Sequence, residues 1–246
     1  MATPDPRPER SDRPPGPPAE PAVDPHARAL AWTHGARFLT TASKLPELPP
    51  GELPELAFVG RSNAGKSTAI NTLAQQRRLA FASRTPGRTQ HINLFDLGPK
   101  DAPDVRFADL PGYGYAAVAR GAKLRWQEVM AEYLQYRRNL GGVVMMVDSR
   151  QGFTDLDQRL LTLIAPRVQS GELRLLVLLT KADKLNRSDA QKALAAAQDQ
   201  LGEVATETAD IGLMLFSALS KQGLGDAAAH LWDWVHPTPL QSPTAV

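Results

Sequence analysis

Two glycines, a lysine and a hydroxyl residue are spaced in this chain as a phosphate-binding loop requires. Residues 60–67 read Gly-Arg-Ser-Asn-Ala-Gly-Lys-Ser and lie between an apolar run at 56–59 and a helical pattern that starts at Lys66. Glycines let successive backbone N–H groups turn toward phosphate oxygens at the positive end of a helix. We predict that Lys66 bridges the β- and γ-phosphates of a nucleotide and that the Ser67 hydroxyl coordinates Mg²⁺. An ordinary glycine turn is the structural alternative.

Two further polar signatures follow later strands. Residues 109–112 read Asp-Leu-Pro-Gly, in which the aspartate can hold a water on Mg²⁺ and the glycine N–H can reach the γ-phosphate. Residues 180–183 read Thr-Lys-Ala-Asp. A fixed carboxylate at Asp183 can accept both N1–H and the exocyclic amine of guanine, a pair that adenine does not offer, while the Lys181 stem lies along the base. Seen alone, these two segments would be a turn and a helix-capping aspartate.

A fourth segment, residues 216–218, ends a strand, and we predict that a backbone N–H there meets the guanine carbonyl. The four segments together contribute the predicted nucleotide-binding residues Gly60, Arg61, Ser62, Asn63, Ala64, Gly65, Lys66, Ser67, Asp109, Leu110, Pro111, Gly112, Thr180, Lys181, Ala182, Asp183, Phe216, Ser217 and Ala218.

Strand and helix patterns alternate along the chain and place each segment after a strand. The predicted strands cover residues 56–59, 91–97, 105–109, 143–148, 173–180 and 213–217, and the predicted helices cover 66–76, 123–138, 155–169, 188–201 and 225–235. Continuous apolar strands between helices are typical of a parallel sheet that is covered on both faces. We therefore predict an α/β fold in three layers with a six-stranded, mostly parallel sheet. Its strand from His91 is antiparallel at one edge, and the site lies at the carboxyl ends of the strands.

Composition and charge exclude several classes of protein. The 246 residues include no cysteine, which excludes disulfides and thiolate metal sites and suits a reducing cytoplasm. The net charge of +2 hides a basic stretch, because residues 60–140 hold 13 Lys and Arg against six Asp and Glu. That stretch indicates an anionic partner. Apolar runs are too short to span a bilayer and the first residues lack the apolar core of a signal peptide, so we expect a cytoplasmic protein without a membrane partner.

The two ends of the chain have the composition of loose tails. Nine of the first 25 residues are proline, and none is aromatic. We predict a disordered Pro-rich tail over residues 1–27, a folded domain over 28–236 and a flexible tail over 237–246. A polyproline docking peptide within residues 13–18 is the functional alternative for the first tail.

The four segments, in this order and spacing, resemble those of Ras-like GTPases. Residues 60–68 (GRSNAGKST), 83–90 (SRTPGRTQ) and 109–116 (DLPGYGYA) are similar to the EngB/YihA/YsxC family of bacterial GTPases, in the TrmE-Era-EngA-YihA-septin class. The resemblance implies a three-layer P-loop GTPase fold, with the folded part of the chain as the GTPase domain, and GTP hydrolysis to GDP and phosphate with Mg²⁺. It also implies a role in assembling the large ribosomal subunit and in cell division and septation, with a subunit precursor rather than DNA as partner.

The resemblance also assigns the parts of the switch. Thr89 matches the switch I threonine that completes the Mg²⁺ shell while a γ-phosphate is present, and Thr85 is the competing candidate. Residues 113 to about 123 match switch II. The implied catalytic residues are Lys66, Thr89 and Gly112, and the implied metal ligands are Ser67 and Thr89. Switch I adds Gly87, Arg88, Thr89, Gln90 and His91 to the nucleotide-binding set.

Three residues depart from the Ras pattern. Tyr113 stands where Ras-type enzymes place a water-orienting glutamine, so we predict slow hydrolysis by the isolated protein. An asparagine at the position of Asn63 is associated in related GTPases with a K⁺ ion that acts as an arginine finger does. The alternative is that Asn63 only stabilises the loop. Thr180 replaces the commoner asparagine of the base-reading motif, so nucleotide affinity is expected to be modest.

Basic residues near the expected switches, interleaved with aromatic ones, predict a surface that meets ribosomal RNA. These cations are Arg77, Arg78, Arg84, Arg88, Arg120, Lys123, Arg125, Arg137 and Arg138. Trp126 and Tyr133 are better explained as core residues. Two rival functions stay open: a P-loop kinase, which has no use for the Thr-Lys-Ala-Asp segment, and a non-catalytic interaction protein of cell division that uses GTP only for structure.

Overall fold

Seven strands form one sheet in this computed structural model, which describes residues 24–80, 91–114 and 120–237, with backbone alone over 120–127. The sheet order is β1-β3-β4-β2-β5-β6-β7. The strands are β1 (Arg37–Ala42), β2 (Glu55–Gly60), β3 (Ile92–Leu97), β4 (Val105–Asp109), β5 (Leu140–Asp148), β6 (Arg174–Thr180) and β7 (Ile211–Leu215). The helices are α1 (Pro25–His34), α2 (Lys66–Leu73), α3 (Arg120–Tyr136), α4 (Asp155–Gln169), α5 (Arg187–Gly202) and α6 (Leu224–Val235).

The predicted α/β fold with a mostly parallel sheet is confirmed, with one correction at its edge. Strands β4, β2, β5, β6 and β7 pair in parallel, and β3 is antiparallel to both of its neighbours. The predicted six strands are seven, because β1 pairs with β3 and takes the edge that we assigned to the strand from His91. Most β1 side chains are exposed or half-buried, so no continuous apolar run marks this strand in the sequence.

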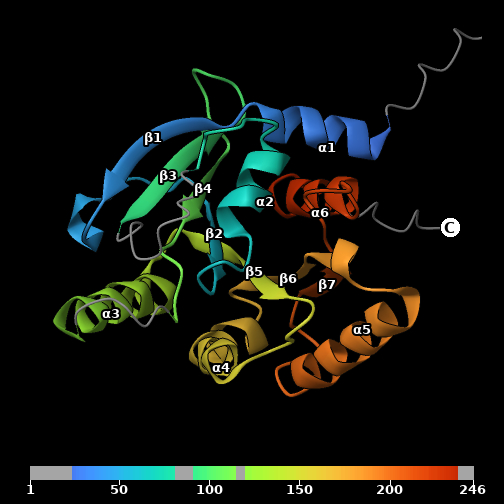
Figure 1. Ribbon diagram of the computed structural model, residues 1–246. Helices are drawn as coiled ribbons and strands as arrows, with labels where there is room; N and C mark the ends of the chain where they lie inside the picture. Colours follow the sequence, from blue (N-terminus) through green and yellow to red (C-terminus); the bar gives the residue numbers. More distant parts are fainter. Residues whose placement is uncertain (1–23, 81–90, 115–119, 238–246) are drawn as a thin grey trace, which may run out of the picture.

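Helices cover both faces of the sheet, as Figure 1 shows: α1, α2 and α6 on one face and α3, α4 and α5 on the other. The central strands are mostly apolar between their ends, as expected for a sheet covered on both sides. Every side chain of β6 after Arg174 is buried. Among the described residues, no helix is both long enough and apolar enough to cross a membrane.

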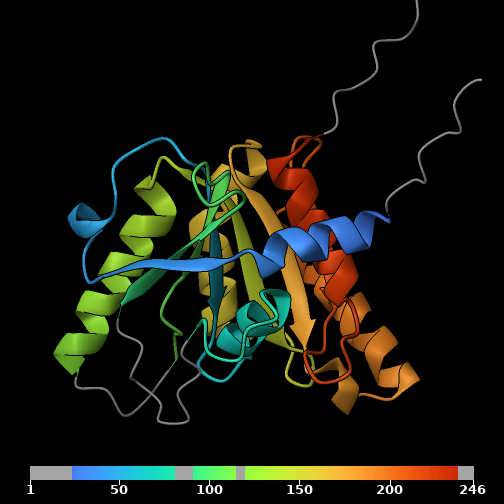
Figure 2. The ribbon, with the colours of Figure 1, turned by 90° about the horizontal axis from the view of Figure 1, so that it is seen from above.

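Helix α1 is an element that the sequence patterns did not mark. Asp24 caps it by accepting a hydrogen bond from the His26 N–H, and it lies across α6 (Figure 2). Asp104, just before β4, contacts both helices. It accepts a hydrogen bond from Nε1 of Trp32 in α1 at 3.1 Å and lies 2.9 Å from Nε2 of His236, which caps the end of α6. The helix begins inside the segment 1–27, so Pro25 is already part of the folded chain, while the domain boundaries themselves stay predictions.

Helix α5 begins one residue before its predicted start at residue 188. Asn186 caps it, because its side chain accepts the backbone N–H of Asp189 at 2.9 Å. Ser188 therefore lies within the first turn of the helix.

His230 makes the stability of the fold sensitive to acid. Its ring is half-buried between α6 and β7, and burial lowers its pKa. The unfolded chain therefore binds a proton more readily than the folded chain, so stability is full above the ordinary histidine pKa of about 6.5 and falls as the pH drops below it. Urea unfolding at several pH values should show this loss, and His230→Gln should reduce it. An unchanged pH dependence in the variant would contradict this reading, although His34, whose pKa burial also lowers, leaves a residual slope.

Candidate nucleotide-binding site

The loop between β2 and α2 has the backbone conformation of a phosphate cradle. β2 ends at Gly60 and α2 begins at Lys66. Gly65 precedes the helix with a left-handed φ of 95°, and Asn63 has a φ of 67°. Glycine adopts this region freely and asparagine tolerates it better than most residues. Turns of this kind form concave nests of N–H groups that bind anions.

Lys66 and Asp109 form a buried ion pair at the carboxyl edge of the sheet. β2 and β4 are parallel neighbours with Phe58 opposite Asp109, and the Lys66 Nζ donates to Asp109 Oδ1. The second carboxylate oxygen, Oδ2, is buried and has no hydrogen-bond partner in the described part of the chain. This carboxylate oxygen of Asp109 and the half-buried Ser67 hydroxyl are oxygen ligands of the kind that Mg²⁺ prefers. These two residues therefore fit the predicted metal ion.

The segment that follows β4 lies directly on the phosphate loop. Ser62 N–H donates to the Tyr113 carbonyl at 2.8 Å, and Tyr113 N–H donates to the Gly60 carbonyl at 3.2 Å. A Cβ added to Gly112 would lie 3.1 Å from the Ser62 nitrogen, so this close approach favours glycine. The Leu110 side chain is buried in the core, so its predicted contact with the nucleotide would be made by its backbone.

The phenol of Tyr113 is fully engaged away from the phosphate loop. Its hydroxyl donates to Asp157 Oδ1 at 2.7 Å, and both side chains are buried. Asp157 Oδ2 accepts the backbone N–H of Thr154 at 2.9 Å and so helps to cap α4. Burial and the neighbouring carboxylate raise the pKa of Tyr113 far above its ordinary range. A phenol in this state is a poor substitute for a water-orienting glutamine.

We expect Tyr113→Phe to lower stability without slowing GTP hydrolysis. The change removes a hydrogen bond to a buried carboxylate, which should cost about 1.5–3 kcal/mol. Urea unfolding and phosphate release measure the two effects. Tyr136→Phe is the matched control, because the Tyr136 side chain is 72% exposed. A hydrolysis rate that fell about tenfold at unchanged GTP affinity would instead place the phenol in the chemistry.

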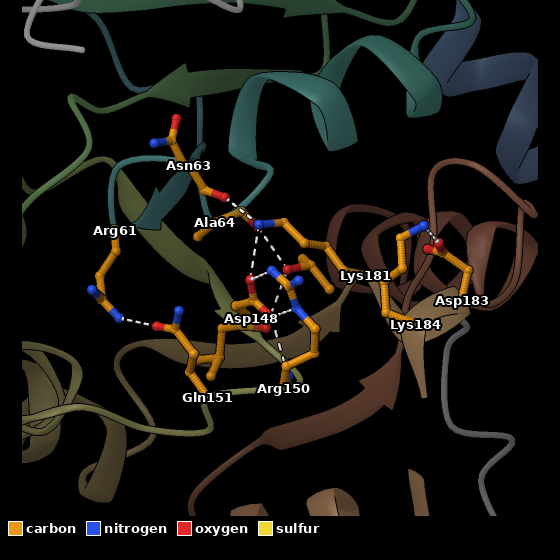
Figure 3. A network of polar contacts seen from close by, with 11 residues as sticks. Arg61, Asn63, Ala64, Asp148, Arg150, Gln151, Lys181, Asp183 and Lys184 are labelled. Atoms are coloured by element: carbon orange, nitrogen blue, oxygen red, sulfur yellow. Dashed lines mark hydrogen bonds and ion pairs between the residues drawn. The ribbon is translucent and has the colours of Figure 1, made fainter. Parts of the chain in front are cut away.

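The Thr-Lys-Ala-Asp segment after β6 is hydrogen-bonded directly to the phosphate loop. Thr180 Oγ1 lies 2.6 Å from the Ala64 carbonyl, to which it donates across 116 positions of sequence. Lys181 adopts a left-handed φ of 59°, and its Nζ donates to the Asn63 carbonyl at 2.7 Å (Figure 3). The hydroxyl of Thr180, the residue that replaces the commoner asparagine, thus holds the two loops together.

Asp183 is oriented by the segment that ends β7. It lies in a short 3₁₀ turn (Ala182–Lys184), and its Oδ1 accepts the hydroxyl of buried Ser217 at 2.7 Å. This hydrogen bond lowers the pKa of the carboxyl and keeps it ionised. The Ala182 N–H also donates to the Phe216 carbonyl at 3.2 Å. The structure thus brings residues 216–218 beside Asp183 and adds an orienting role for the Ser217 side chain, while the predicted contact of this segment with the guanine carbonyl stays a prediction.

Two groups of polar contacts beside the phosphate loop were not predicted (Figure 3). Asp148 at the end of β5 contacts Lys181 and Arg150, and Arg61 Nη1 donates to Gln151 at 2.6 Å. They border a pocket of about 300 Å³ between the loop and the end of β5. Asp148 does carry a sequence signal, because it is the charged residue that ends an apolar strand at the same side of the sheet as the site.

Switch I lies mostly outside the described residues. Thr85, Gly87, Arg88, Thr89 and Gln90 fall in residues 81–90, so their roles stay predictions. His91 is described, and its Nδ1 lies 2.9 Å from the Ser43 hydroxyl. Because β3 is antiparallel, its start pairs with the end of β4, where Asn93 lies opposite Asp109. The residues that directly follow switch I therefore lie beside the site. Switch II beyond Gly114 is not described as far as residue 119.

Arg137 was predicted to lie on the RNA-binding surface, but the structure places it in an ion pair with a buried carboxylate. Arg137 pairs with buried Glu55 at 2.6 Å, and buried Tyr133 donates to the same carboxylate at 2.7 Å. Arg137 therefore stabilises the base of the sheet, and Tyr133 is a core residue as predicted. Arg77, Arg78 and Arg138 are exposed. The side chains of Arg84, Arg88, Arg120, Lys123, Arg125 and Trp126 are not among those described.

The fold and its loops together define a P-loop GTPase: a parallel sheet carries a phosphate loop, and the Asp-x-x-Gly and Thr-Lys-x-Asp segments are bonded to it. The family model described as "50S ribosome-binding GTPase" matches residues 55–181. The chain is 58% identical over 209 residues to the probable GTP-binding protein EngB of Polaromonas sp., covering 85% of this chain and 82% of that protein. It is 56% identical to the counterpart from Albidiferax ferrireducens, of which it covers 97%. The chain belongs to the EngB family of GTP-binding proteins and is a GTPase.

Solved structures agree on the fold. A crystal structure of a probable GTP-binding protein EngB matches 75% of this chain and 100% of its own, with a TM-score of 0.58 and 17% identity. Era from Aquifex aeolicus bound to GDP·AlF₄⁻ matches 75% of this chain and 57% of its own, with a TM-score of 0.57 and 21% identity.

Proposed function

We propose that this GTPase is a molecular switch that acts on a precursor of the large ribosomal subunit and is needed for normal cell division and septation. In its GTP state the switches would present a surface to the precursor, and hydrolysis would release it. The cytoplasm, where ribosomal subunits are assembled, is the compartment that this proposal requires. The proposal is supported by the description of the matching family as ribosome-binding GTPases. Era, a neighbour of the same fold, has been solved with nucleotides of 16S ribosomal RNA.

One observation supports the nucleotide role most strongly: hydrogen bonds join the phosphate loop to both of the other loops. Ser62 is bonded to the segment that starts at Asp109, and Ala64 is bonded to Thr180. A guanine nucleotide that extends from Asp183 to Lys66 would therefore contact three loops that are already held together. Such preorganisation lowers the entropy cost of binding.

In the proposed reaction, water attacks the γ-phosphorus of GTP in line with the bond to the β–γ bridging oxygen. That bond breaks, its electron pair leaves with GDP, and the proton of the water passes to the released phosphate. Lys66, which pairs with Asp109 in the structure, would turn to the β- and γ-phosphates, while the Gly112 N–H would meet the γ-phosphate. Mg²⁺, held through Ser67, Thr89 and a water on Asp109, would neutralise charge on the phosphates.

The ribosomal proposal is tested by co-sedimentation with ribosomal subunits in the presence of a non-hydrolysable GTP analogue, GDP or no nucleotide. We expect the GTP analogue to favour binding to large-subunit particles, and we expect salt to weaken that binding, because phosphate contacts release counterions. Binding that ignored both nucleotide and salt would contradict the proposal. Phosphate release measured with and without subunits also judges the non-catalytic alternative, which predicts no stimulation.

We further propose that Asn63 helps to hold K⁺ beside the phosphates. Its backbone is fixed by Lys181, and its side chain is exposed and points away from the polar network around Asp148 (Figure 3). Turnover should then be faster in K⁺ than in Na⁺, and Asn63→Ala should remove that difference. Equal rates in the two salts would leave Asn63 with the loop-stabilising role alone.

A further inference from the structure

We propose that Asp148 is a positioning residue for nucleotide binding. It accepts hydrogen bonds from Arg150 and holds Lys181 against the phosphate loop before the guanine base binds. The inference rests on the proposed contact between Lys181 and the base. It extends that contact to a carboxylate on a different strand, outside the four motif segments.

Asp148 is the point where three elements of the site are joined (Figure 3). Its Oδ2 accepts the Lys181 ammonium at 2.8 Å, and the same ammonium donates to the Asn63 carbonyl at 2.7 Å. Arg150 completes the carboxylate with Nη2 on Oδ2 at 2.7 Å and Nε on Oδ1 at 3.0 Å. The Arg150 backbone N–H donates to Oδ1 at 3.1 Å. Each carboxylate oxygen therefore accepts two hydrogen bonds.

The register of the sheet places this carboxylate where the lysine needs it. β5 and β6 pair in parallel with Asp148 opposite Thr180, the residue before Lys181. The Ser149 N–H donates to the Thr180 carbonyl at 3.0 Å, which keeps the two strand ends together. Only 9% of the Asp148 side chain is exposed, so the pair with the lysine is shielded from water and salt more than a surface pair would be.

Fixing this lysine before binding has a thermodynamic consequence. A free lysine side chain samples many rotamers, and ordering it costs up to about 2 kcal/mol. The contacts with Asp148 and Asn63 already order it in the structure, so a base that lies along its stem avoids that cost. Loss of Asp148 should therefore weaken GDP binding about tenfold to thirtyfold.

A purely structural role would show itself differently. After removal of Asp148, the two cations that it binds can reach water, because the side chains of Lys181 and Arg150 are 33% and 48% exposed. The fold should therefore survive Asp148→Ala, as thermal unfolding can verify. Asp210→Ala is the matched control, since it breaks an Asp–Arg contact of 3.6 Å with Arg174. Arg174 begins β6, so this contact lies at the amino ends of the strands, away from the site.

The test is a double-mutant cycle on GDP affinity, measured by calorimetry or with a fluorescent GDP analogue on the full chain. Asp148→Ala should weaken binding about tenfold or more in the wild-type background and less than about twofold in the Lys181→Ala background. Arg150→Gln should weaken binding in the same direction by a smaller factor. It serves as the second variant if Asp148→Ala fails to fold.

The outcomes separate the two claims. If Lys181→Ala leaves GDP affinity unchanged, the proposed contact between Lys181 and the base is wrong and the inference falls with it. If Lys181→Ala weakens binding but Asp148→Ala does not, the contact stands and the positioning role is wrong. If Asp148→Ala has the same effect with and without the lysine, its effect does not pass through Lys181, and the inference is again overturned.

Discussion

Asp183→Asn should weaken GDP binding about a hundredfold to ten-thousandfold. The Asp183 carboxylate, oriented by the Ser217 hydroxyl at 2.7 Å, presents acceptors to the two adjacent donors of guanine. Asparagine replaces one of these acceptors with a donor, which then faces another donor. Because the exchange leaves the size of the side chain almost unchanged, the loss should appear in affinity rather than in folding.

Calorimetry with GDP and with xanthosine diphosphate measures this prediction. Xanthine carries a carbonyl where guanine carries its exocyclic amine, so the variant should bind xanthosine diphosphate better than the wild type does. Asp189→Asn makes the same chemical change on the exposed first turn of α5 and should leave both affinities unaltered. Unchanged GDP affinity in Asp183→Asn would remove Asp183 from the base site, and with it the guanine specificity that we propose.

Lys66→Met should reduce the rate of GTP hydrolysis about a hundredfold to a thousandfold, the loss typical of removing one preorganised group that stabilises developing charge. The same variant should be less stable without nucleotide. Lys66 and Asp109 are 7% and 0% exposed and form an ion pair, so loss of the lysine leaves a buried carboxylate without its partner. Such a loss costs about 3–5 kcal/mol.

A second substitution separates the two effects. Adding Asp109→Asn to Lys66→Met removes the unpaired charge, so urea unfolding should show most of the stability restored while phosphate release stays low. A single Lys66→Met variant that hydrolysed GTP at the wild-type rate would show that the lysine has no role in the chemistry. A double variant that regained hydrolysis would show that the single variant had failed through misfolding.

Of the strands that position the site, β2, β5 and β6 were predictable because each contains a continuous apolar run, whereas β4 carries Arg106 among its apolar residues. β2, β4, β5 and β6 begin and end close to their predicted bounds, and a polar motif follows each of three of them. Edge elements carry a weaker signal. β1 is largely exposed or half-buried, and α1 follows a Pro-rich segment with no strong amphipathic pattern of its own. Their places are set by contacts with partners distant in sequence, such as the Thr33 hydroxyl on the Leu73 carbonyl at 2.8 Å.

The α/β class, the order of the loops and the residue types that can contact phosphate and guanine could be predicted from the amino-acid sequence, because they are properties of short segments. The partner of each side chain could be identified only in the folded structure. Tyr113 pairs with Asp157, Arg137 with Glu55, and Asp148 with Lys181, across separations of 33 to 82 residues. Such pairs depend on sheet order and register, which bring strand ends together in space and leave no local spacing to read.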